Sequence, residues 1–158
     1  MAAAIAAHPG KVTAYIDGVA ASAATRVALA ASEVRIVDSG MFMIHNSWTI
    51  ALGNKSDIRQ TADLLEKIDA SINADYAKKT GKTTEEIAAL MDAETWFSAQ
   101  EALDAGFVDA IDSSSQNAKS WDLSAYKNAP KPKEPNEQQQ LANQRALNEK
   151  RLRLLQIT

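Results

Sequence analysis

The sequence predicts an α/β domain with a mostly parallel sheet, followed by a linker and a C-terminal helix. Short runs of β-branched and aromatic residues alternate with helical segments between residues 12 and 111. The strongest helical signal, at 56–79, places apolar residues at steps of three and four. After Asp112 the composition shifts to serine, proline, lysine and glutamine, which is typical of a linker.

Three strands and two helices are expected in the first part of the chain. Residues 1–7 are alanine-rich and are interpreted as the last part of a helix that stops at the following Pro-Gly pair. The runs at 12–16, 33–37 and 41–44 are predicted strands because turn-forming residues bound them. The run at 41–44 is apolar on both faces, which is typical of a buried strand. A helix of small residues is expected at 20–31.

The next part of the chain is predicted to be mainly helical. Gly81 ends the helix at 56–79. Capping boxes that begin at Thr83 and Ser98 open two shorter helices. A turn that carries two carboxylates is expected between these helices, and 107–111 is a predicted strand.

These elements define three predicted regions. The folded domain is expected to cover residues 1–112, the linker 113–137, and a basic, partly amphipathic helix 138–158. The tail is expected either to dock on another protein or to remain solvated.

Composition excludes several classes of function. The net charge is −3, so there is no basic surface that indicates nucleic-acid binding. The chain has no cysteine, which excludes disulfides and thiolate metal sites. It contains no run of 18 apolar residues, so no membrane span is expected.

Ser22 lies among small residues in the segment GVAASAA, where a strand is expected to pass into a helix. Small neighbours would let a peptide carbonyl approach within about 3 Å of the hydroxyl. The first amides of a helix have no partner inside it and can stabilise an oxyanion. Taken alone, Ser22 could equally be a helix N-cap.

His45 and two acidic residues could complete a site around this serine. His45 follows the apolar strand at 41–44 and could accept the serine proton as a general base. His8 lies in an expected loop and is the weaker candidate. Asp92 and Glu94 precede two aromatic residues, and a carboxylate there could orient an imidazole. Taken alone, these residues would be a structural histidine and solvated turn carboxylates.

Taken together, the segments GVAASAA, MIHN and ETWFSAQEALDAGFVD resemble the ClpP-like serine peptidase family. The order is serine, histidine, acid, as in the proteolytic subunit of the Clp protease. The variant is similar to the ClpP-like head maturation proteases of tailed phages and prophages. The resemblance covers roughly residues 5–112 and implies a ClpP/crotonase-like spiral of β-β-α units.

The resemblance assigns a role to each candidate residue. It implies that Ser22 is the nucleophile, that His45 is its base and that the amide of Ala23 is one oxyanion donor. Glu94 falls where the main bacterial family has an aspartate, and its longer side chain can still reach an imidazole; Asp92 is the second choice. No metal or cofactor is implied.

The family also has a long segment before the nucleophile turn, with several strands and a glycine-rich loop that gives the second oxyanion donor. Only 17 residues precede Gly18. The chain is therefore expected to be an N-terminally truncated member of the family, in which the first part of the domain is missing.

The function expected from the resemblance is a serine endopeptidase that acts through an acyl-enzyme in phage prohead or capsid maturation. Its substrates would be proteins or peptides, such as capsid or scaffold protein. A homo-oligomeric ring, an ATP-dependent unfoldase partner, and a location in the cytoplasm or within the procapsid are implied as well. Binding to nucleic acid or to a membrane is not expected.

Two alternatives remain. One is a different enzyme on the same spiral fold, either a signal-peptide peptidase with a serine–lysine pair or a crotonase-type enzyme; the MIHN and ETW segments argue against both. The other is an inactive, truncated ClpP-like subunit with a structural or assembly role.

Overall fold

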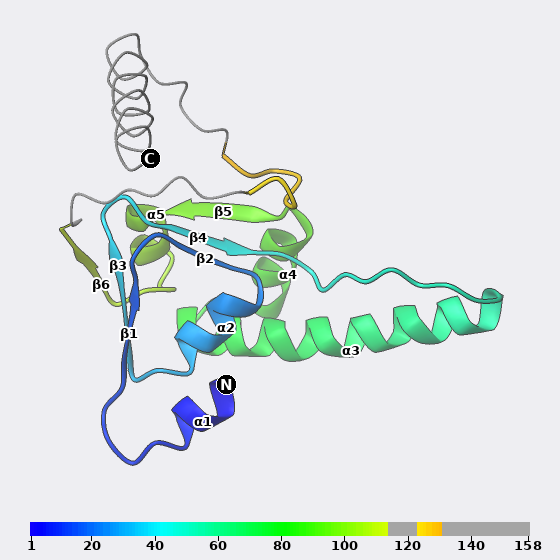
Figure 1. The fold of residues 1–158 in the computed structure, drawn as a ribbon, viewed down its shortest axis with the longest axis horizontal. Coiled ribbons are helices and arrows are strands. Elements are labelled where there is room, and N and C mark those ends of the chain that lie inside the picture. The colour runs from blue at the N-terminus through cyan, green and yellow to red at the C-terminus, as the bar shows by residue number, and fades with distance from the viewer. Residues whose placement is uncertain (114–122, 131–158) are drawn as a thin grey trace, which may run out of the picture.

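The computed structural model describes residues 1–113 and 123–130, within which the strands form two sheets. The first sheet has the order β1-β3-β6 and the second β2-β4-β5. Their bounds are β1 Thr13–Ile16, β2 Val19–Ala21, β3 Glu33–Val37, β4 Met41–Ile44, β5 Thr95–Ser98 and β6 Ala110–Asp112. The β4–β5 pair is antiparallel and the other three pairs are parallel, which confirms a mostly parallel α/β fold. The two sheets meet at an angle (Figure 1).

The helices agree with the sequence prediction to within a few residues. Their bounds are α1 Ala2–Ala6, α2 Ala23–Leu29, α3 Lys55–Thr80, α4 Thr84–Asp92 and α5 Ala99–Asp104. The predicted capping boxes at Thr83 and Ser98 are formed. Gly81 ends α3 with a φ of 73°, a conformation that glycine adopts without steric cost. The predicted helix at 138–158 and most of the predicted linker lie outside the described residues.

The structure corrects three predicted boundaries. Residues 19–21 form strand β2 where a helix was expected from residue 20, because pairing with β4 overrides the helix preference of alanine. Residues 95–98 form strand β5 where a turn was expected, and they pair with β4. The last strand begins at Ala110, because the amides of Phe107 and Val108 bond to the carbonyl of Ala102 at the end of α5.

The long helix α3 both supports and projects from the domain. Its 26 residues span about 39 Å. Figure 1 shows its C-terminal part against the domain and its N-terminal part extending away. Exposed apolar side chains follow this projection and the segment before it, at Trp48, Ile50, Leu52, Ile58 and Leu64. Across the described residues, no helix has both the length and the apolar character needed to cross a membrane.

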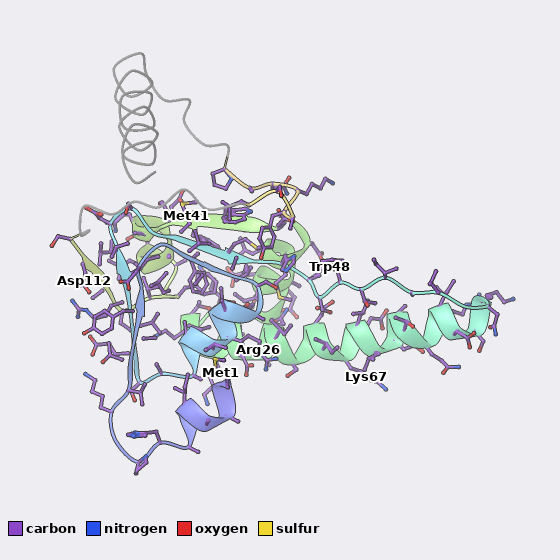
Figure 2. The ribbon with its side chains drawn as sticks, in the orientation of Figure 1. Met1, Arg26, Met41, Trp48, Lys67 and Asp112 are labelled. Atoms are coloured by element: carbon purple, nitrogen blue, oxygen red, sulfur yellow. The ribbon has the colours of Figure 1, made fainter. Side chains whose placement is uncertain are left out.

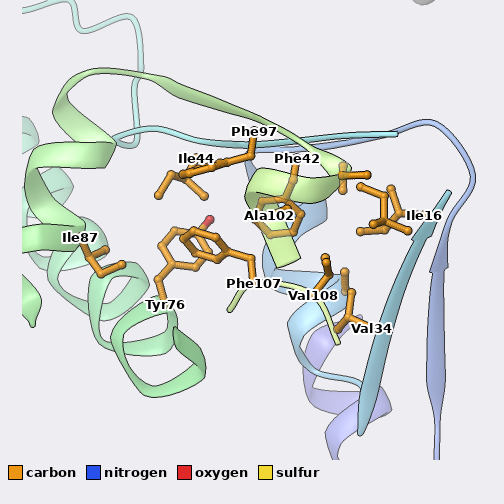
Figure 3. Close-up of a cluster of buried hydrophobic side chains, with 14 of the residues drawn as sticks. Ile16, Val34, Phe42, Ile44, Tyr76, Ile87, Phe97, Ala102, Phe107 and Val108 are labelled. Carbon is orange, nitrogen blue, oxygen red and sulfur yellow. The ribbon is translucent and has the colours of Figure 1, made fainter. Parts of the chain in front are cut away.

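Aromatic side chains form the centre of the core. Phe42 of β4 stacks on Phe107 with ring centroids 5.1 Å apart, and Phe97 of β5 lies 5.0 Å from the same ring. Tyr76 of α3 meets Phe107 edge-on at 5.8 Å. Figure 3 shows these rings beside one another, with Ile87 of α4 next to them. The core therefore joins the second sheet to α3 through one buried phenylalanine.

We predict that Phe107→Ala destabilises the fold by about 3–5 kcal/mol, because the ring is fully buried and a cavity would remain. The free energy of unfolding from urea denaturation measures the loss. Ile58→Ala is the matched control, since that side chain is 48% exposed, and it should change the value by less than about 0.5 kcal/mol. Equal losses in the two variants would contradict the central role of Phe107.

Candidate active site

The pairing of two parallel strands brings Ser22 and His45 together. Strands β2 and β4 run side by side, with Ala21 opposite Met43. Ser22 directly follows β2, and its amide donates to the carbonyl of Met43 at 3.1 Å. His45 directly follows β4 at the same edge of the sheet. The Ser22 Oγ and the His45 Nε2 are 2.7 Å apart, which is a good hydrogen-bond distance.

The backbone of Ser22 is strained. Its φ is 56° and its ψ is −124°, a conformation that non-glycine residues rarely adopt. Such strain costs about 1–3 kcal/mol and is concentrated at functional sites. The side chain makes no capping hydrogen bond to α2, although Ser22 is the N-cap residue. The interpretation of the Ser22 side chain as a helix cap is therefore wrong, because its hydroxyl contacts His45 instead.

The amide of Ala23 lies beside the serine. Ala23 is the first residue of α2, and the first amides of a helix have no partner within it. It also lines a pocket of about 310 Å³ next to the serine–histidine pair. The other lining residues are Ser22, Arg26, His45, Ser47, Trp48, Ile68, Ile72 and Tyr76. An extended peptide with an apolar side chain could therefore place a carbonyl near the serine hydroxyl.

The antiparallel pairing of β4 with β5 places Glu94 near His45. Ile44 is opposite Thr95, so the residue that follows β4 and the residue that precedes β5 are neighbours. Glu94 has a φ of 48°, the second non-glycine residue with a positive φ in the described chain. Its carboxylate accepts from the amide of Asn128 at 2.6 Å, the amide of Lys127 at 3.3 Å and the indole of Trp96 at 3.4 Å.

These contacts lower the pKa of Glu94 below its ordinary value. Burial raises the pKa of Glu94, but the hydrogen bonds from Asn128, Trp96 and Lys127 and the charge of His45 lower the pKa by more. Glu94 and His45 therefore interact electrostatically. In the described residues, neither Glu94 nor Asp92 hydrogen-bonds His45. Asp92 instead accepts from the side-chain amide of Asn46 at 2.7 Å.

A family model described as Clp protease matches residues 1–115. The chain belongs to the Clp protease family. This range contains Ser22, His45, Asp92 and Glu94 and ends before residues 123–130.

Curated relatives agree with this assignment. The chain is 44% identical to the "ATP-dependent Clp protease proteolytic subunit 1" of Leifsonia xyli subsp. xyli over 59 residues. These residues make up 37% of this chain and 30% of the relative. It is 36% identical to the "ATP-dependent Clp protease proteolytic subunit 2" of Tropheryma whipplei over 76 residues. These residues make up 48% of this chain and 42% of the relative. The matched stretch thus spans less than half of either relative.

The turn that carries Ser22 is also held by residues that the sequence did not single out. The hydroxyl of Thr25 is 2.5 Å from both the Ser22 carbonyl oxygen and the hydroxyl of Tyr76. Thr25 is fully buried and Tyr76 is 1% exposed. Tyr76 was predicted only as part of the apolar face of α3. Because Tyr76 fits the regular apolar spacing of that face, the sequence did not predict its hydrogen bond to Thr25. No pattern in the sequence distinguished Thr25.

A second missed contact involves Tyr126, which lies in the predicted linker. Its ring meets that of His45 edge-on with centroids 5.9 Å apart, and it meets Trp96 at 5.5 Å. The signal in the sequence is a tryptophan, a leucine and a tyrosine at positions 121, 123 and 126 of a mostly polar stretch. His8, the weaker histidine candidate, bonds Gly10 in an exposed loop.

We predict that Thr25→Val destabilises the protein by about 1–3 kcal/mol, because it leaves the buried hydroxyl of Tyr76 without its partner. Thr25→Ser keeps the hydroxyl and should lose less. Urea denaturation of both variants measures the difference. A valine variant as stable as the serine variant would show that the Thr25–Tyr76 contact does not stabilise the fold.

Proposed function

We propose that this chain is a serine endopeptidase that hydrolyses peptide bonds through an acyl-enzyme. The single observation that carries the proposal is the 2.7 Å contact between the Ser22 hydroxyl and His45, at the edge of an open pocket. A serine next to an imidazole can lose its proton as it attacks a carbonyl. The strained backbone of Ser22 and membership of the Clp protease family support the same role.

The proposed mechanism uses only side chains and amides of the chain. His45 accepts the proton of Ser22 as the hydroxyl attacks the scissile carbonyl, and the Ala23 amide donates to the developing oxyanion. His45 then protonates the leaving amine. Water deprotonated by His45 attacks the acyl-enzyme, and the serine is restored.

Glu94 is proposed as the third member of this site, with Asp92 as the second choice. Glu94 is ionised and interacts electrostatically with His45, so its charge would stabilise the imidazolium formed during the reaction. Asp92 bonds Asn46 instead. The role of Glu94 is therefore mainly electrostatic in this arrangement.

The finer assignment is a role in phage head maturation, on capsid or scaffold protein in the cytoplasm or the procapsid. Its support is the likeness of the GVAASAA, MIHN and ETWFSAQ segments to phage ClpP-like proteases. A homo-oligomeric ring is part of the proposal, since five large apolar side chains along the α3 projection are exposed in the single chain. The relatives are described as subunits of ATP-dependent proteases, which favours an unfoldase partner.

We predict that a fluorophosphonate probe labels Ser22 in the full chain. Ser22→Ala should abolish labelling, and His45→Ala should slow it by about 10²–10⁴-fold, because general-base catalysis contributes that much. Mass spectrometry of the labelled peptide measures both. Ser56→Ala is the matched control, since Ser56 is exposed in the first turn of α3 and does not line the pocket, and it should label at the wild-type rate.

The same experiment separates the proposal from the alternative of an inactive subunit with an assembly role. A wild-type chain that takes up no probe while it forms a ring, as measured by native mass spectrometry, would favour that alternative. Persistent labelling of Ser22→Ala would refute the assignment of the nucleophile.

We predict that Glu94→Gln lowers kcat by about 10–100-fold, which corresponds to about 1.4–2.7 kcal/mol of transition-state stabilisation. The reason is the loss of a negative charge that interacts with His45. Asp92→Asn should change kcat by less than about threefold. Steady-state hydrolysis of a fluorogenic peptide measures both values, and the opposite order would make Asp92 the third member.

A further inference from the structure

Residues 123–130, which we call the docked segment, contact the acidic side of the candidate site. Figure 1 shows this stretch in gold beside the start of β5, and Figure 2 draws it in the same place with its side chains as sticks. It lies beyond residue 115, where the match to the Clp protease family ends. Its contacts are therefore a feature of this chain that membership of the family does not assign.

The docked segment holds Glu94 through its backbone. The amides of Lys127 and Asn128 both donate to the Glu94 carboxylate, at 3.3 and 2.6 Å. The side-chain amide of Asn128 donates to the carbonyl of Ala93 at 2.9 Å, next to Glu94. Three hydrogen bonds thus fix the segment on the turn between α4 and β5.

The same segment also contacts the histidine. The ring of Tyr126 meets the imidazole of His45 edge-on and also meets the indole of Trp96. Trp96 donates to Glu94, so the aromatic contacts and the amide contacts converge on the same two groups. His45 follows the end of β4 and precedes a stretch without regular secondary structure, which leaves the orientation of its ring to such side-chain contacts.

The docked segment lies outside the pocket beside Ser22. Every residue that lines this pocket comes from 22–76. A substrate bound there would meet Ser22, His45 and α3, whereas Tyr126 contacts the imidazole together with Trp96 of β5. The segment is therefore placed to support the imidazole and does not fill the substrate pocket.

We propose that the docked segment is a positioning element of the active site, in which Tyr126 orients His45 and the amides of Lys127 and Asn128 hold Glu94 in place. This inference rests on the proposed function of Ser22 and His45. A nucleophile and its base must be aligned closely, and a displacement of about 1 Å can cost 10²-fold in rate. The docked segment supplies such alignment from a part of the chain outside the matched family domain.

The first test compares Tyr126→Ala with Tyr126→Phe in the full chain. We expect the alanine variant to lower kcat and the rate of fluorophosphonate labelling by about 10–100-fold. KM should stay within about twofold, because the pocket is unchanged, and phenylalanine should restore the rate, because it keeps the ring. Tyr15→Ala is the matched control, since Tyr15 is 64% exposed on β1, and it should behave as wild type. Probe titration gives kcat per active site, which separates misalignment from loss of folded protein.

The second test removes one hydrogen bond from the backbone. Asn128→Pro and Asn128→Ala both lose the bond to Ala93, but only proline also lacks the amide that donates to Glu94. We expect the proline variant to fall to the activity of Glu94→Gln and the alanine variant to keep most of its activity. This pair decides the question if Tyr126→Ala melts far below wild type.

The outcomes separate this inference from the proposed function. If wild type labels at Ser22 and Tyr126→Ala and Asn128→Pro react at the wild-type rate, the positioning role is overturned and the proposed function stands. Faster reaction in these variants would also overturn it, because the segment would then restrain the site. A wild-type chain that takes up no probe would overturn the proposed function itself, and the positioning role with it.

Discussion

The site depends on the parallel pairing of β2 with β4. The two strands end at the same edge of their sheet, and the amide of Ser22 extends the pairing by donating to Met43. Ser22 and His45 are 23 residues apart in the sequence, yet they meet because each directly follows one of these strands. The antiparallel pairing of β4 with β5 adds Glu94 at the same edge. One three-stranded sheet thus positions all three groups, and their order in the chain follows from its topology.

Helix α3 packs against this arrangement and supports it. Its Tyr76 packs against Phe107 and also reaches Thr25, whose hydroxyl contacts the carbonyl of the strained Ser22. The same helix supplies Ile68 and Ile72 to the pocket. The core, the turn at Ser22 and the pocket beside it therefore share one element. A change in how α3 packs would alter all three together, which links stability to chemistry in this fold.

The sequence predicted the features that are encoded locally. The capping boxes at Thr83 and Ser98 and the glycine at the end of α3 mark helix boundaries through short-range hydrogen bonds, so they could be located in advance. The segments around Ser22 and His45 could be recognised from their order. Strand β2 could not, because its alanines prefer helix and only the contact with β4 makes them extended. The docking of Tyr126 could not either, because it depends on a contact between residues 81 positions apart in the chain, Tyr126 and His45.

The position and the pKa of Glu94 depend on its hydrogen-bond partners. A carboxylate has about four lone-pair sites, and here three donors occupy part of them, two from the docked segment and one from Trp96. These donors lower the pKa of Glu94 against the effect of burial, which favours the ionised form near His45. They also fix its position, although its left-handed backbone alone would be unfavourable. In the proposed mechanism an acid held in this way acts on the imidazole through its charge, so the residues that hold Glu94 take part in the same proposed role.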